Sequence, residues 1–181
     1  SAALPSGKKV EVIAKRFLSI KDKELGLIRY RLKSLNFSAP VKIISYLDGD
    51  VQNEDSNYDE KFWIEVERKI GVTEGYLLME TKKTGFRVCH GMCTRIFLNG
   101  SEQTCNKEPM EKEKGIANVF EVSLKEGDEI TIEKYIAIHS SLYSDKAGLM
   151  KQTGISVKKA VAAGFQHFSV DANLYRGRQK T

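Results

Sequence analysis

The chain has 181 residues, of which 41% are hydrophobic and 29% are charged, and its formal net charge is +5. This length and composition are typical of one soluble globular domain. They exclude a membrane protein of the helical kind, because no apolar run approaches the roughly 20 residues that a membrane-spanning helix needs.

The positive charge does not indicate a nucleic-acid partner. Acidic and basic residues alternate in segments such as EVERK (65–69), whereas phosphate binding requires basic residues gathered on one face. A small basic group occurs only at the terminal Arg176, Arg178 and Lys180, and such tails are more often disordered than functional.

The first half of the chain is predicted to consist of β-strands separated by turns. Residues 25–35 are the example with the clearest period of two, because Ile28, Tyr30 and Leu32 alternate with charged residues. Strands are expected at residues 10–20, 25–35, 41–47, 62–69, 75–82 and 86–95.

The second half predicts further strands and then one helix. A hairpin is expected at Asn99-Gly100, a charged loop at 106–116, and strands at 119–124 and 130–139. Residues 156–168 place apolar side chains at helical intervals, with Ser156 as the expected N-cap.

This order of elements predicts an all-β fold. We expect an antiparallel β-sandwich with a short C-terminal helix, because many strands followed by one helix do not fit βαβ units. The expected division is a β-sandwich domain at residues 1–153 and a helix with a tail at 154–181.

The three cysteines indicate a reducing compartment. Cys89, Cys93 and Cys105 are an odd number, and the N-terminal residues lack an export signal, so free thiols and a cytoplasmic location are expected. The segment Cys89-His90-Gly91-Met92-Cys93 also permits a zinc interpretation. On a strand, however, Cys89 and Cys93 share a face that His90 does not, so small buried residues are preferred and no metal is expected.

The longest irregular segment, residues 48–60, is acidic. Its carboxylates could bind calcium, but Asn53 and Asp59 occupy the positions where a helix-loop-helix calcium site needs Gly and Glu. A solvated loop rich in turn-forming residues is therefore the preferred interpretation.

An aromatic and amide group at the end of this segment is the candidate ligand site. Asn57, Tyr58, Phe62 and Trp63 lie close together in sequence, and aromatic faces beside amides commonly hold sugar rings. The alternative is that Phe62 and Trp63 begin the next strand and that Trp63 packs in the core.

Motifs for nucleotide binding or serine hydrolase chemistry are not found in the sequence. There is no Gly-x-Ser-x-Gly elbow, phosphate-binding loop or dinucleotide fingerprint, so no catalytic residue is assigned.

Several segments together resemble the N-terminal domain of glycoside hydrolase family 65, the family of the maltose, trehalose and kojibiose phosphorylases. The longest is LIRYRLKSLNFSAPVKIISYLDGDVQNEDSNYDEKFWIEV (27–66). The same order continues in KKVEVIAKRFLSI (8–20), TKKTGFRVCHGM (81–92), EGDEITIEKYIAIHSS (126–141) and KKAVAAGF (158–165).

The resemblance implies a three-part enzyme in which an N-terminal β super-sandwich precedes a helical linker and an (α/α)6 barrel. It implies inverting phosphorolysis of α-linked glucosides, with phosphate as the nucleophile and no cofactor. The barrel would carry the acid catalyst, so this chain alone is expected to be inactive and to lack the first strands of the sandwich. A stand-alone carbohydrate-binding module that uses Asn57, Tyr58 and Trp63 is the alternative, and a homodimer is a further expectation.

Overall fold

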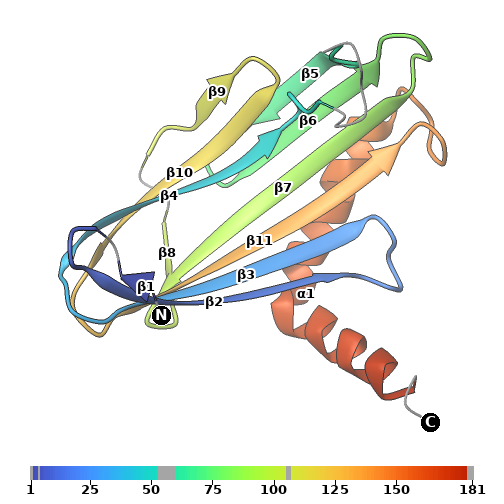
Figure 1. The fold of residues 1–181 in the computed structure, drawn as a ribbon. Coiled ribbons are helices and arrows are strands. Elements are labelled where there is room, and N and C mark those ends of the chain that lie inside the picture. Colours follow the sequence, from blue (N-terminus) through green and yellow to red (C-terminus); the bar gives the residue numbers. More distant parts are fainter. Residues whose placement is uncertain (1, 4, 53–59, 105–106, 179–181) are drawn as a thin grey trace.

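The computed structural model describes the backbone of residues 2–3, 5–52, 60–104 and 107–178, and within these ranges the side chains from residue 5 to residue 168. Within these residues the chain folds into two antiparallel sheets and one C-terminal helix (Figure 1). The expected all-β fold with a C-terminal helix is confirmed.

The larger sheet has eight strands. Its path runs in the order β1 (Ala2–Ala3), β2 (Lys9–Leu18), β3 (Leu25–Ser34), β11 (Glu129–Ser140), β7 (Arg87–Leu98), β6 (Glu74–Thr81) and β5 (Trp63–Ile70), and β8 (Ser101–Gln103) pairs with the end of β7. The hairpin between β7 and β8 turns at Asn99-Gly100, as predicted, and both residues have positive φ.

The smaller sheet has three strands, in the order β4 (Ala39–Asp48), β10 (Gly115–Leu124) and β9 (Met110–Lys112). It packs on one face of the larger sheet, and α1 (Leu149–Arg178) covers part of the opposite face (Figure 1). The larger sheet is therefore the middle of three layers.

Successive side chains of a strand point to opposite faces of the sheet, so the larger sheet contributes residues to two hydrophobic cores, one on each face. Between the sheets, Ile96 and Ile130 pack against Phe120 and Val122 of β10. On the helix side, the fully buried Tyr135 belongs to the cluster that the helix completes, whose other buried members are Leu25, Leu27, Tyr76, Ala137, Val157, Ala160, Phe165 and Phe168.

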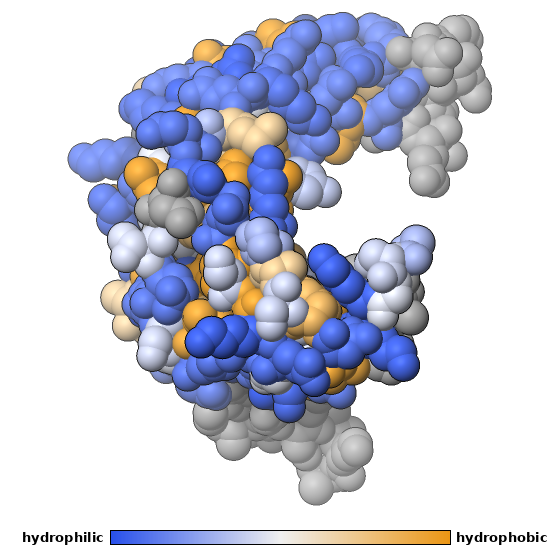
Figure 2. Space-filling model, turned by 90° about the vertical axis from the view of Figure 1, so that its left-hand side faces the viewer, coloured by the Kyte–Doolittle hydropathy of each residue, from blue (hydrophilic) through white to orange (hydrophobic). Residues whose placement is uncertain are grey.

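The two sheets differ in width, so part of the larger sheet's inner face extends beyond the smaller sheet. Figure 2 shows the molecule hollowed on one side, with hydrophobic residues visible at the base of the hollow. Val12 and Leu18 of β2 are 48% and 78% exposed. Lys134 of β11 bridges the two sheets by donating to the carbonyl of Tyr46 in the edge strand β4, at 2.5 Å.

Two element predictions were wrong. The helix begins at Leu149, seven residues before the expected start, so Ser156 is not a cap but lies inside the helix, where its hydroxyl contacts His139 Nε2 at 2.9 Å. The Asp145 carboxylate instead accepts from the Gly148 N–H just before the helix. The charged segment 106–116 contains strand β9 and the first residues of β10.

The helix is interrupted at Gly164, whose φ of 74° and ψ of 160° are not helical. Phe165 immediately follows this break, and its ring packs against Phe17 and lies under the guanidinium of Arg29. The break at Gly164 therefore lies where the helix meets strands β2 and β3.

Candidate functional site

The outer face of the smaller sheet holds a shallow pocket that we call the Tyr46 trough. Strand pairing aligns its side chains in rows, because directly opposed residues in antiparallel strands point to the same face. One row is Tyr46, Ala117 and Met110, and the next is Asp48, Gly115 and Lys112. In both rows the central strand β10 carries the small residue and the two outer strands carry the large ones.

The trough has a volume of about 320 Å³. Tyr46 and Met110 are 58% and 49% exposed and form its two sides, whereas Ala117 between them is buried and forms its floor. Ile44 lines it beyond Tyr46, so its interior is largely apolar. An exposed aromatic ring beside an apolar floor is a surface to which a flat apolar face of a ligand can bind.

An ion pair closes the other end of the trough. Lys112 Nζ lies 3.1 Å from Asp48 Oδ2, and the lysine chain passes over Gly115 to reach it. A Cβ at Gly115 would stand 2.5 Å from Lys112 Cε, so a side chain at this position would displace the lysine. The hydrogen bond from the Asp50 N–H, together with the bond from Lys112, lowers the pKa of Asp48.

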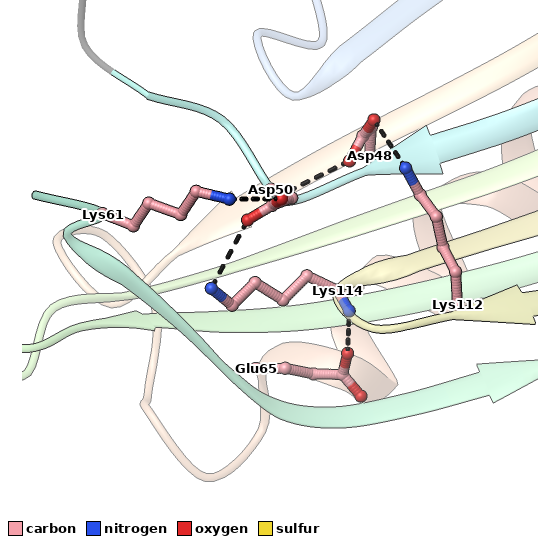
Figure 3. Close-up of polar contacts among 6 residues, drawn as sticks. All are labelled: Asp48, Asp50, Lys61, Glu65, Lys112 and Lys114. Atoms are coloured by element: carbon pink, nitrogen blue, oxygen red, sulfur yellow. Dashed lines mark hydrogen bonds and ion pairs between the residues drawn. The ribbon is translucent and has the colours of Figure 1, made fainter. Parts of the chain in front are cut away.

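The ion pair belongs to a wider polar network at the ends of β4, β5 and β9 (Figure 3). Asp50 Oδ2 lies 2.6 Å from Lys61 Nζ, and Asp50 Oδ1 lies 3.4 Å from Lys114 Nζ. The hydrogen bond from Lys61 is the largest cause of the lowered pKa of Asp50, and the same bond raises the pKa of Lys61. Two residues of the acidic segment 48–60 are thus held by lysines.

The turn between β9 and β10 is fixed by the same network. Lys114 has a φ of 55°, in the left-handed region that side chains rarely adopt. Its N–H donates to Glu65 Oε2 at 2.8 Å, and its carbonyl accepts from the Gly49 N–H at 2.7 Å. Glu65 is also paired with Arg68 at 2.6 Å. These contacts hold the turn, and with it the Lys112 side of the trough.

The arrangement suits binding better than acid catalysis. A general acid must keep its proton near neutral pH, which requires a raised pKa. Asp48 and Asp50 have lowered pKa values and cationic partners, so both are ionised at neutral pH and can only accept hydrogen bonds.

Of the predicted sugar-binding residues the structure describes Trp63, which does not line this trough. Trp63 is half-buried and packs against the inter-sheet cluster of Leu77, Met79, Met92 and Ile116. Its ring centroid lies 6.4 Å from that of Phe86. The packing alternative for Trp63 therefore describes its position, whereas Asn57 and Tyr58 lie outside the described residues.

Cys89 and Cys93 are free thiols on the helix side of the larger sheet. Burial raises the pKa of both thiols and lowers the pKa of His90. In the described part of the chain no three His, Cys, Asp or Glu side chains gather as a metal site would require. Cys105 lies outside that part, as do Lys180 and the side chains of Arg176 and Arg178.

The sequence analysis missed Tyr46, Met110 and Lys112 as a group. The available signal was that Ile44 and Tyr46 occupy the solvent-facing positions of a strand whose alternate residues Val41, Ile43 and Leu47 already supply its apolar face. Among the described residues, no helix combines the length and apolarity needed to cross a membrane.

Comparison with known proteins gives three findings. The family model for the N-terminal domain of glycosyl hydrolase family 65 matches residues 1–172. The maltose phosphorylase of Bacillus subtilis (strain 168) is 40% identical over 79 residues, which are 44% of this chain and 10% of the relative. The α,α-trehalose phosphorylase of Thermoanaerobacter brockii is 24% identical over 170 residues, which are 90% of this chain and 22% of the relative.

The fold is also found in a solved structure described as that of a kojibiose phosphorylase from the human microbiome. The TM-score is 0.77 at 18% identity, and the match covers 93% of this chain and 21% of the other. The chain thus spans only about a fifth or less of each of these similar proteins.

Proposed function

The chain belongs to the N-terminal domain family of glycosyl hydrolase family 65, and from this we propose that it is the non-catalytic β-sandwich of an enzyme that acts on α-glucosides with phosphate. The observation that carries the proposal is the match over residues 1–172, which spans nearly the whole β-sandwich and α1. Two curated relatives that match the chain are a maltose phosphorylase and a trehalose phosphorylase.

The chemistry of the described site supports a non-catalytic role. Inverting cleavage of a glycosidic bond needs a carboxylic acid that is protonated when the substrate binds. Asp48 at the Tyr46 trough and the neighbouring Asp50 have lowered pKa values instead. Catalysis would then come from a separate domain, and the (α/α)6 barrel of the family is the partner that we propose.

The test is a phosphorolysis assay on the chain as it stands. Purified protein is incubated with inorganic phosphate and maltose, trehalose or kojibiose, and glucose 1-phosphate is measured. We expect no release above that of a matched sample without protein. Release that depends on protein concentration and on phosphate would overturn the proposal.

The division into a sandwich at residues 1–153 and the start of a linker helix with a tail at 154–181 remains a prediction, although α1 itself begins at Leu149. Homodimerisation remains an expectation to be measured by sedimentation. The free thiols of Cys89 and Cys93 support a reducing, cytoplasmic location. Carbohydrate binding at Asn57, Tyr58 and Trp63 remains a prediction.

A further inference from the structure

We infer that the Tyr46 trough binds a single glucosyl unit of an α-glucoside. The choice of sugar rests on the proposed function, whereas the location rests on the geometry of strands β4, β9 and β10. Trp63, to which the sequence pointed, does not line the trough but packs between the sheets.

The shape of the trough fits one pyranose ring. Its volume of about 320 Å³ is near the lower end of the 300–1,000 Å³ range of small-molecule pockets. The exposed ring of Tyr46 provides an aromatic face for the C–H groups of the sugar, and the small Ala117 leaves room for the ring beside it. Met110 closes the opposite side with a flexible apolar chain.

The ion pair at the end of the trough supplies the polar contacts that a sugar requires. Asp48 is ionised and can accept hydrogen bonds from hydroxyl groups, because each of its oxygens keeps a lone pair beyond the bond from Asp50 or Lys112. The side chain of Lys112 is 63% exposed and has further N–H groups to donate. A ligand with hydroxyls at one end and an apolar ring face matches this arrangement.

This combination favours a sugar over a second copy of the chain as the occupant. A stable protein interface covers on the order of 800 Å² on each partner, whereas the trough is a narrow pocket that ends at a charged pair. Gly115 supports the same conclusion, because its missing side chain is what allows Lys112 to reach Asp48 across the sheet.

The test is calorimetric titration of the purified chain with glucose, maltose, trehalose and kojibiose. We expect saturable binding in the millimolar range by at least one of these sugars. Tyr46→Ala should weaken it by about tenfold or more, and Asp48→Asn should weaken it by a smaller factor. Tyr143→Ala is the matched control, because this tyrosine is 85% exposed and does not line the trough.

The outcomes separate this inference from the proposed function. Absence of binding by all four sugars, or binding that Tyr46→Ala leaves unchanged, overturns the inference but does not affect the phosphorolysis result. A dimer that dissociates on Tyr46→Ala substitution would show that a second copy occupies the trough, and would also overturn it. Circular dichroism of each variant verifies folding, which an exposed side chain should not alter.

Discussion

Lys134 shows how one residue limits the stability of the sandwich. Its side chain enters the space between the two sheets and donates to the carbonyl of Tyr46, and among the described residues no ion pair joins it to a carboxylate. Burial lowers the pKa of this amine to about 8. In an unfolded chain a lysine has a pKa of about 10.4, so the folded protein binds fewer protons between these two values.

We therefore expect Lys134→Met to stabilise the protein at pH 7. The charged amine costs free energy in the folded state below pH 8, and this cost disappears as the pH rises through 8 toward 10. Removing it should raise the free energy of unfolding by roughly 1 kcal/mol at pH 7 after allowance for the lost hydrogen bond. The advantage of the variant should shrink between pH 8 and 10.

Urea unfolding of both proteins at pH 7, 8, 9 and 10 measures this difference. Lys42→Met, at an exposed position on β4, is the control and should show no comparable trend. If Lys134→Met is less stable than the wild type at pH 7, the hydrogen bond to Tyr46 outweighs the cost of the buried charge, and the prediction is wrong.

The residues of the candidate site could not be predicted from the sequence. Period two correctly indicates which residues of strand 41–47 face inward, but Tyr46 meets Ala117 and Met110 only through the register of strands more than 60 residues apart. Local periodicity contains no information on that register. Trp63 was predicted to bind sugar because the sequence shows that aromatic residues lie beside an amide. The sequence does not show whether the tryptophan side chain is buried.

The strands and turns that were predicted correctly are those determined by neighbouring residues in the sequence. The alternation of Ile28, Tyr30 and Leu32 and the Asn99-Gly100 turn are both local signals, and both are found in the structure. Strand β9 was missed because its turn at Lys114 is held by Glu65 and Gly49, which are distant in sequence. The start of the helix was missed because the stabilising contact of Asp145 lies well before the apolar repeat.

The break in α1 predicts how a glycine-to-alanine substitution at Gly164 changes stability, and Gly154 in the same helix provides the control. Gly164 has a φ and ψ combination that is essentially restricted to glycine, so Gly164→Ala should lower the free energy of unfolding by about 1–3 kcal/mol. Gly154 lies in the same helix with ordinary room for a Cβ, since the nearest atom is 3.7 Å away. Gly154→Ala should therefore stabilise the protein by about 0.5–1 kcal/mol.

Thermal or urea unfolding of the two variants compares the same chemical change at two points of one helix. Opposite signs are the expected result. Destabilisation of similar size by both substitutions would mean that the conformation of Gly164 is not what distinguishes the two positions.

For the molecule as a whole, the central question is whether the sandwich and the helix form one cooperative unit. The larger sheet contributes to both cores: Ile130 faces the smaller sheet and Tyr135, on the same strand, faces α1. Loss of either covering layer exposes one face of strands that the other layer also requires. This sharing predicts a single unfolding transition.

Phe165→Ala tests this prediction from the helix side. The ring is 3% exposed, packs edge-on against Phe17 at 4.9 Å, and lies 3.7 Å from the guanidinium carbon of Arg29. Its removal should cost about 3–5 kcal/mol. Trp63, the only tryptophan, packs with the cluster between the sheets, so its fluorescence reports the opposite core.

We expect the fluorescence of Trp63 and the helical circular dichroism signal to shift to the same lower urea midpoint in Phe165→Ala. Ile155→Ala, at a 59% exposed position of the same helix, is the matched control and should change stability by less than about 0.5 kcal/mol. If the helical signal shifts while the Trp63 midpoint stays that of the wild type, the helix unfolds independently of the sandwich. A shared shift would show instead that α1 is an integral layer of the domain, because destabilising its contact with the sheet then unfolds the core on the other side.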